Sequence, residues 1–386
     1  MTDQDHIDRI DALTRNARNT WFTLLAALVF VSVTLMGVQH IDYYGVDRAT
    51  KLPLVGVDVP TRYFFVAAPI LIAAIYGYFH LYLIRLWDAL GAAPAEVHEL
   101  RLGDAITPWL ISDAALHFRR KLRSDNCTTP RTLESGAMVL NFLLSWGFGL
   151  VVLWFLWTLS WPARDVRMTS VAGVSFGVSI VSGASSLAMM ARRMRRTPPG
   201  AAPNLWGTRA QIIGLVIGTA ALLFQGYEKT AGPIDKLASL NLSNENIVDK
   251  PSGWLPHDIA RADFRAVWCK REDVEDCKVL GKREEEFDEE WKIRRAAALA
   301  DMRRPDWAKP GKNKFDLRDA NLVSAFLSSA DLRGAQMDGA NLIEAQMEGA
   351  DLRGAQMDGA DLRWAQMEGA DLRGAQMDGA DLFTAQ

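Results

Sequence analysis

The chain has 386 residues, a formal net charge of −3 and 23% charged residues, values that are ordinary for a soluble protein. These averages combine an apolar first half with a charged second half, so they exclude no class of protein by themselves. The sequence contains no Walker loop, G-x-G-x-x-G, nucleophile elbow or H-E-x-x-H, which excludes the enzyme classes that depend on those motifs.

Five apolar stretches without Asp, Glu, Lys or Arg fill most of residues 19–227. Each is 18 to 29 residues long, and a membrane-spanning helix needs about 20 apolar residues. Five such stretches in succession predict a multi-pass α-helical membrane domain over residues 21–227, after a cytoplasmic N-terminal tail of residues 1–20. The stretches are 19–39, 63–84, 135–163, 168–191 and 210–227, and the last is the shortest.

Lys and Arg concentrate on one side of this domain and predict its orientation. With the N-terminus in the cytoplasm, the inner segments hold 14 Lys and Arg residues and the outer loops hold five. Five spans then place the C-terminal half of the chain outside. The largest inner loop, residues 88–136, contains the amphipathic stretch Ala105–Lys121. We expect this stretch either to lie on the inner membrane surface or to pack against the bundle.

Two of the three cysteines lie close together in the half predicted to be outside, where disulfides persist. We expect Cys269 and Cys277 to form a structural disulfide; the alternative is two unrelated free thiols. Their flanks contain no histidine and no C-x-x-C, so no zinc site is predicted. Cys127 falls in the predicted inner loop and is expected to stay reduced.

A segment of mixed character, residues 228–314, separates the membrane domain from a five-residue repeat. Ala238–Asn244 and Ala262–Ala266 each look like one unit of that repeat. They predict an irregular first coil interrupted by an inserted loop. Residues 282–304 carry acids first and arginines last, which predicts one charged helix. We expect this helix to cap the open end of the repeat domain, or alternatively to bind a partner.

Residues 315–386 repeat every five positions. Alanine recurs from Ala320 to Ala385, and Leu or Met follows two residues later each time. A period of five fits neither a helix nor a flat strand, whereas fixed self-similarity is the signature of a solenoid whose stacked coils share one core. The Leu and Met side chains expected to face this core are Leu322, Leu327, Leu332, Met337, Leu342, Met347, Leu352, Met357, Leu362, Met367, Leu372, Met377 and Leu382.

This pattern resembles the pentapeptide-repeat family, whose unit is A-[DN]-[LF]-x-x. The resemblance implies a right-handed quadrilateral β-helix with four repeats per coil, and it places the alanines inward as well. Because ADLRG alternates with AQMDG or AQMEG, side chains of one kind would stack in columns from coil to coil. Like charges in a column repel. The two expected columns are Arg333, Arg353 and Arg373, and Asp338, Asp358 and Asp378.

The segment Lys51–Trp87 also resembles the membrane segment found upstream of the repeats in some bacterial pentapeptide-repeat proteins. This resemblance implies the bacterial inner (cytoplasmic) membrane, with the lipid bilayer as one partner. The N-terminus is expected in the cytoplasm and the β-helix in the extracytoplasmic space.

Three function classes remain open. The first is a membrane-anchored, non-enzymatic interaction scaffold whose β-helix binds a protein partner or another copy of itself. The second is an acidic mimic of DNA that inhibits a DNA-binding protein, as some soluble members of the family do. Residues 315–386 hold five Arg and 13 Asp or Glu, but the predicted outer location argues against this class, and no nucleic acid is expected as a partner. The third is a transporter or sensor with an accessory repeat domain.

Polar residues inside the predicted spans, such as His80 and Asn141, are too sparse to favour transport. The scaffold is the function that the sequence favours, and no cofactor or metal is expected.

Phe383 is the candidate contact residue at the end of the repeat. An open β-helix end exposes unpaired backbone groups and core side chains. Soluble members of the family dimerise through their C-terminal ends, so the resemblance implies stacking on another copy. Phe383 is apolar where most equivalent positions hold Arg. The alternatives are a truncated chain and an end blunted by its own last residues.

Overall fold

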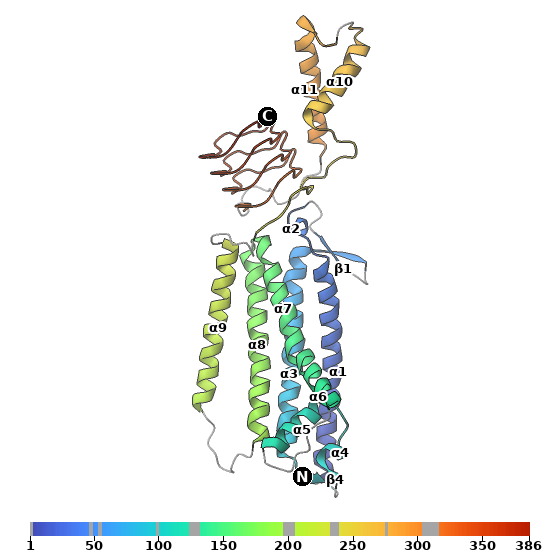
Figure 1. Ribbon diagram of the computed structural model, residues 1–386, viewed down its shortest axis with the longest axis vertical. Helices are drawn as coiled ribbons and strands as arrows, with labels where there is room; N and C mark the ends of the chain where they lie inside the picture. Colours follow the sequence, from blue (N-terminus) through green and yellow to red (C-terminus); the bar gives the residue numbers. More distant parts are fainter. Residues whose placement is uncertain are drawn as a thin grey trace. The chain divides into compact units, whose positions relative to one another are not determined.

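The chain divides into two compact units. The computed structural model describes residues 3–45, 49–52, 56–97, 100–122, 132–195, 205–231, 239–274, 277–302 and 316–386. The first unit contains the long apolar helices, and the second contains the repeats together with two short segments from the connections between helices (Figure 1). The second unit consists of Gln39–Thr50, Pro162–Arg164 and Pro233–Gln386.

Four helical segments of the first unit are long and apolar enough to cross a membrane, counted over the described residues. A helix of 20 residues already spans about 30 Å, and each of these segments has at least 26 residues. They are α1 (Asp3–Met36), α3 (Thr61–Ala92), the segment Met138–Ala163 and α8 (Val166–Met194). The third combines the end of α6 (Thr132–Phe142), a π-helical turn (Leu143–Gly147), α7 (Phe148–Leu159) and a 3-10 turn (Trp161–Ala163).

The fifth predicted span falls on α9 (Leu205–Ala231), a helix of 27 residues that packs against α8. Its length is sufficient to span a membrane. The structure describes only some of its side chains, and its insertion into a membrane stays a prediction.

Close helix packing in the first unit depends on small residues. Tyr76 of α3 fits into a slot between Gly149 of α7 and Gly183 of α8, where an added Cβ would lie 2.6 Å and 2.7 Å from the tyrosine. The hydroxyl of Tyr76 donates a hydrogen bond to the carbonyl of Trp146 at 3.0 Å. Gly149 and Gly183 therefore serve close contacts between helices of the bundle.

The loop between α3 and α6 packs against the bundle through α5 (Leu110–Leu122). Arg119 is buried and donates hydrogen bonds to the carbonyls of Leu90 and Ala93, which terminate α3. Trp109 and Leu116 are buried beside it. Of the two expectations for this stretch, the packed helix agrees with the structure, because a buried arginine that satisfies helix-end carbonyls is not available to lipid. The loop also contains α4 (Leu102–Ala105) and the antiparallel pair β3 (Glu96–Val97) and β4 (Leu100–Arg101).

The repeats form a solenoid with one coil every 20 residues. Parallel bridges join equivalent positions of successive coils, such as Asp331 to Asp351 and Asp351 to Asp371. The first coil includes Asn241, which pairs with Asn321, so the predicted repeat unit at Ala238–Asn244 does join the solenoid. The predicted unit at Ala262–Ala266 is wrong, because these residues are helical in α10 (His257–Arg271).

Two residues from the helix connections close the first coil of the solenoid. The backbone N–H of Asn241, which bridges to no preceding coil among the described residues, donates to Nδ1 of His40 at 2.9 Å. Arg164 donates to the carbonyl of Arg318 at 2.6 Å and pairs with Asp316 at 2.5 Å. Side chains thus satisfy backbone groups that a solenoid end leaves unpaired.

The helix α2 (Ile41–Tyr44) packs its side chains on the apolar core of the same coil. The strands β1 (Ala49–Leu52) and β2 (Val57–Pro60) form a two-stranded sheet beyond it. The charged helix expected to cap the solenoid is α11 (Glu284–Ala300), preceded by a 3-10 turn (Gly281–Arg283). That expectation is wrong, because α11 contacts the repeats at Glu348 and Gly349, on a side of the solenoid.

Candidate interaction surfaces

The four sides of the solenoid have different chemistry, although their inner surfaces are alike. The inward alanine, leucine and methionine side chains from Leu317 to Ala365 are at most 1% exposed. In the last coil this burial ends: Met367, Leu372 and Met377 are partly buried and Leu382 is 44% exposed. The outward residues therefore decide what each side can bind.

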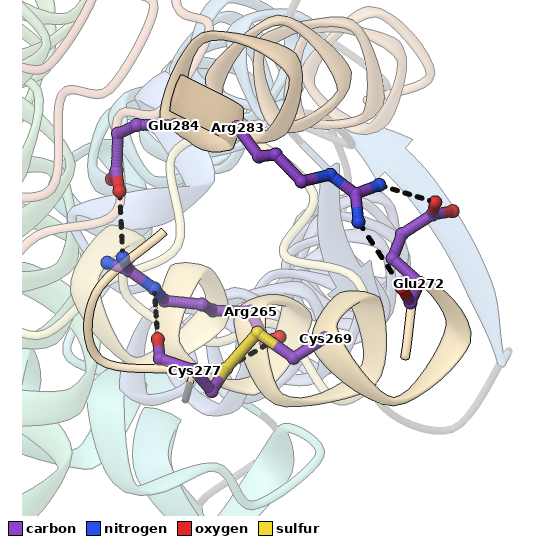
Figure 2. The surroundings of a disulfide bond; sticks show 6 residues. All are labelled: Arg265, Cys269, Glu272, Cys277, Arg283 and Glu284. Atoms are coloured by element: carbon purple, nitrogen blue, oxygen red, sulfur yellow. Dashed lines mark hydrogen bonds and ion pairs between the residues drawn. A yellow bond between two sulfur atoms is a disulfide. The ribbon is translucent and has the colours of Figure 1, made fainter. Parts of the chain in front are cut away.

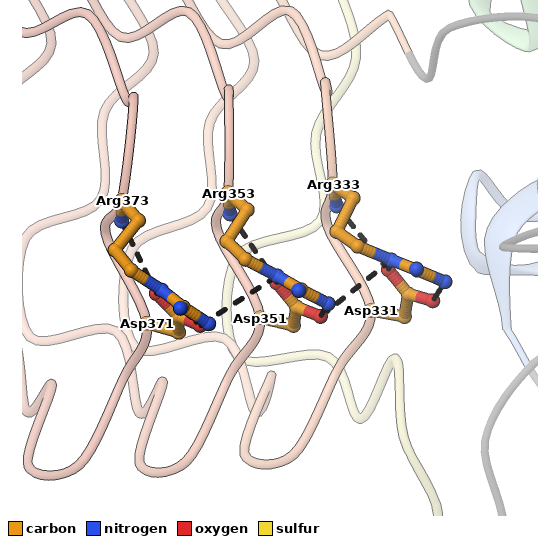
Figure 3. A network of polar contacts seen from close by, with 6 residues as sticks. All are labelled: Asp331, Arg333, Asp351, Arg353, Asp371 and Arg373. Atoms are coloured by element: carbon orange, nitrogen blue, oxygen red, sulfur yellow. Dashed lines mark hydrogen bonds and ion pairs between the residues drawn. The ribbon is translucent and has the colours of Figure 1, made fainter.

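One side carries alternating charges that neutralise one another. The guanidinium of Arg333 binds Asp331 of its own repeat, with Nε 2.8 Å from Oδ1, and lies 3.5 Å from Asp351 of the next coil (Figure 3). Arg353 repeats this arrangement with Asp351 and Asp371. The expected repulsion within the arginine column is wrong, because an aspartate lies between each pair of arginines. We call Asp331, Arg333, Asp351, Arg353, Asp371 and Arg373 the Arg–Asp ladder.

The ladder shifts the pKa of its carboxylates. Hydrogen bonds from the Arg373 side chain, with burial opposing them, lower the pKa of Asp371 to about 2. The same kind of bond from Arg353 lowers the pKa of Asp351. Both carboxylates are therefore ionised over the whole physiological range.

The column of Asp338, Asp358 and Asp378 has a structural function. Oδ1 of Asp338 accepts the backbone N–H of Asp358 at 3.2 Å, and Oδ1 of Asp358 accepts that of Asp378 at 2.9 Å. Each carboxylate thus binds a backbone donor of the following coil. These bonds to an ionised acceptor offset part of the like-charge repulsion that the sequence predicts.

A helical hairpin, residues 257–300, is inserted before the repeats and consists of α10, the 3-10 turn and α11. A disulfide joins Cys269 to Cys277 with a Cα–Cα distance of 5.7 Å, while Cys127 lies outside the described residues. Arg265 donates to the carbonyl of Cys277 at 3.0 Å and to Glu284 at 2.9 Å (Figure 2). The disulfide and these bonds hold the turn against both helices.

The hairpin docks on the side of the solenoid that carries glutamate instead of aspartate. Arg295 of α11 makes a bidentate pair with Glu348, at 2.7 Å and 2.6 Å, and both side chains are at most 10% exposed. Leu299 packs on Gly349, where an added Cβ would lie 2.9 Å from the leucine. The longer side chain of Glu348 and the absence of a side chain at Gly349 thus allow α11 to dock on this side.

His257, Asp258 and Glu368 meet at the edge of the docked hairpin with ligand atoms within 4.8 Å of one another. The N–H of Trp291 donates to Nε2 of His257 at 3.2 Å, so the neutral imidazole carries its proton on Nδ1, the nitrogen that faces the carboxylates. A histidine that binds metal through Nδ1 needs an acceptor at Nε2. The geometry therefore favours a direct contact between Nδ1 of His257 and the Glu368 carboxylate, and it does not fit a metal ion.

An exposed apolar surface lies near the end of the repeats. Trp364 is 55% exposed and Phe383 is 66% exposed, and their rings meet edge to face with centroids 6.3 Å apart. With Leu382 they form what we call the aromatic edge. Trp364 has a φ of +62°, in the left-handed region that most later repeats fill with glycine. A tryptophan there costs conformational energy that a glycine would not.

On this side the fourth and fifth positions of the repeat differ in every coil, reading Val-Ser, Ile-Glu, Arg-Trp and Phe-Thr. After Ser329 the other three sides read only Arg-Gly, Asp-Gly or Glu-Gly. The sequence prediction included Phe383 but missed Trp364. The signal was present in the sequence as ADLRW and ADLFT, both departures from ADLRG. Repeats that diverge on one side only are typical of a binding surface.

A comparison with models of protein families gave a match to the C-terminal part of the chain. Residues 316–354 and 345–382 match the family described as pentapeptide repeats, with eight copies. These residues are pentapeptide repeats, which confirms the resemblance seen in the sequence. The comparison with curated proteins gave no match.

Three solved structures of pentapeptide-repeat proteins are similar to this chain. Rfr23 from the cyanobacterium Cyanothece is 35% identical over 19% of this chain and 48% of its own, with a TM-score of 0.18. HetL from the cyanobacterium Nostoc is 33% identical over 20% of this chain and 43% of its own, with a TM-score of 0.11. A protein of the Arabidopsis thaliana thylakoid lumen is 26% identical over 19% and 61%, with a TM-score of 0.11. The chain spans about half the length of these relatives.

Proposed function

We propose that this protein is a membrane-anchored, non-enzymatic scaffold that binds a protein partner, or a second copy of itself, through the aromatic edge of its β-helix. The observation that carries the proposal is Trp364, a large exposed side chain in a backbone conformation that favours glycine. Tryptophan is among the residue types enriched at the positions that dominate protein–protein binding, and contiguous exposed apolar side chains mark interaction sites.

The contacts of the first coil support an extracytoplasmic β-helix. His40 lies in the connection between α1 and α3, and Arg164 lies in the connection between α7 and α8. The distribution of Lys and Arg predicts that both connections are outside. Both contribute to the unit that contains the repeats, which supports a β-helix on the same side.

The charge distribution does not favour the DNA-mimic alternative. The ladder neutralises its aspartates with arginines, and the hairpin covers Glu348. The column of Asp338, Asp358 and Asp378 is the main remaining row of acids on the described repeats. A duplex presents two continuous rows of phosphates, so one short column is a poor substitute.

Site-specific photo-crosslinking tests the scaffold. Trp364 is replaced by a photoreactive benzoylphenylalanine in the full chain, and irradiated cells are searched for adducts of discrete mass. The matched control is the same replacement at Arg373, which is exposed on the ladder side. We expect adducts from position 364 and none from position 373. Absence of adducts at 364, or equal adducts at both positions, would refute binding through the aromatic edge.

A further inference from the structure

Arg294 of α11 differs from the other described arginines of the hairpin. Its guanidinium lies over the ring of Phe264, 5.2 Å from the centroid, and no carboxylate of the described residues is within ion-pair distance of it. Glu290, one turn earlier, is already bound to Arg271 and Trp268. The arginines that do have carboxylate partners are Arg261, Arg265, Arg271, Arg283 and Arg295.

Arg294 lines an open pocket between α10, α11 and the segment before them. The pocket has a volume of about 290 Å³, close to the lower limit for pockets that hold small molecules. Its apolar wall comes from Trp254, Phe264 and Trp291, with Leu255 and Val267 at the sides. Trp254 is fixed by Arg295, whose guanidinium lies 3.8 Å from the ring centroid. The wall is therefore held by residues that also dock the hairpin.

Asp263 of α10 lines the same pocket and is exposed. Within the described part of the chain it has no ion-pair partner, and it does not pair with Arg294. The pocket thus presents an aromatic wall with one carboxylate and one guanidinium, neither of which has an ion-pair partner among the residues that the structure describes. A simple anion would meet Asp263, and a simple cation would meet Arg294, so each would be repelled by one of the two charges.

We propose that this pocket binds a zwitterionic small molecule with an apolar side chain, of the class of the hydrophobic α-amino acids. Arg294 binds the carboxylate, for which its planar guanidinium is suited. Asp263 accepts the ammonium, and the apolar side chain packs on Trp254, Phe264 and Trp291. This site lies on the hairpin and does not depend on the scaffold function of the aromatic edge.

Isothermal titration calorimetry of the full chain in detergent tests the proposal with three probes. They are L-phenylalanine, N-acetyl-L-phenylalanine, which lacks the ammonium, and phenethylamine, which lacks the carboxylate. We expect L-phenylalanine to bind, and each of the other two to bind at least about tenfold more weakly, because each leaves one of the two charge-assisted contacts unmade.

Arg294→Gln and Asp263→Asn are each expected to weaken L-phenylalanine binding about tenfold or more. Lys292→Gln removes an exposed cation of α11 outside the pocket and is expected to leave binding unchanged. Circular dichroism verifies that the exposed substitutions leave the fold intact. The proposal is overturned if L-phenylalanine does not bind at millimolar concentration, if Arg294→Gln binds it as the parent does, or if N-acetyl-L-phenylalanine binds equally well.

Discussion

Each residue of the five-residue unit has a separate physical function. In ADLRG the alanine and leucine fill the core, and the aspartate accepts the backbone N–H two residues later, as Asp331 does from Arg333 at 3.3 Å. Asparagine can do the same, as Asn341 does for Ile343 at 3.2 Å. This bond explains why Asp or Asn occupies the second position of the repeats that begin Ala-Asp or Ala-Asn, since a short side-chain acceptor stabilises the turn. The arginine then neutralises the aspartate.

Replacing a core residue is expected to cost far more than replacing its outward neighbour. The side chain of Leu352 is 0% exposed, so Leu352→Ala leaves a cavity in the core. We expect this to cost about 2–5 kcal/mol in the stability of the distal coils. Arg353→Gln removes an exposed ion pair and should leave the stability of the distal coils nearly unchanged. Hydrogen exchange of residues 350–386 measures both. Equal effects would mean that the assignment of inward and outward positions is wrong.

The ladder predicts a definite response to acid. The folded-state pKa of Asp371 is about 2, below its ordinary value of 3.8, so the folded state binds fewer protons than the unfolded state. The stabilisation is therefore fully present above about pH 4 and is lost as the pH falls toward 2. In Arg373→Gln the pKa of Asp371 should rise toward 3.8. A carboxyl ¹³C titration measures it, and an unchanged pKa in the variant would contradict the account.

At the scale of secondary-structure elements, small changes in the repeat decide where the hairpin docks. Glu348 stands where the opposite side of the solenoid holds aspartate, and the additional methylene lets it reach Arg295. The turn of the hairpin is fixed separately by its disulfide and by Arg265. Docking and internal stability of the hairpin therefore rest on different residues and can be perturbed separately.

Removing one partner of the docking pair should release the hairpin. Glu348→Gln leaves Arg295 as a buried charge without its counter-ion, which we expect to cost about 3–5 kcal/mol. Glu344→Gln is the matched control, because Glu344 is exposed and its carboxylate accepts a bond from Ser324. Limited proteolysis of the segment before α11 measures release. Equal cleavage of the two variants would show that the pair does not hold the hairpin.

The disulfide is tested by counting thiols. Denatured, non-reduced protein should react with one maleimide, at Cys127, and reduced protein should react with three, because Cys269 and Cys277 are joined. Three labels before reduction would exclude the bond. A protein lacking Cys127 provides the control and should show no label until it is reduced.

At the scale of the whole molecule, periodic features were predictable and isolated contacts were not. The 20-residue coil follows from a repeat that the sequence displays directly. His40 and Arg164 close the first coil from positions about 200 and 150 residues away, and no local pattern marks either of them. The prediction for Ala262–Ala266 was wrong because the sequence ADFRA is compatible with a repeat as well as with a helix. The helix is favoured by Phe264 and Trp268, which are four residues apart and both buried.

The charged helix was assigned to the solenoid end because solenoids need caps. The two closing residues come instead from connections between the apolar helices, which leaves α11 available for the side of the solenoid. A cap supplied by those connections ties the first coil to the segments that link α1 to α3 and α7 to α8.

The side of the membrane on which the β-helix lies tests this account most directly. A reporter that fluoresces only in the cytoplasm is fused after Gln386, and a reporter that is active only outside the cytoplasm is fused there in a second strain. The account predicts a dark first fusion and an active second one, because His40 and Arg164 bind the first coil from connections predicted to be outside. A bright cytoplasmic fusion with an inactive second reporter would contradict it.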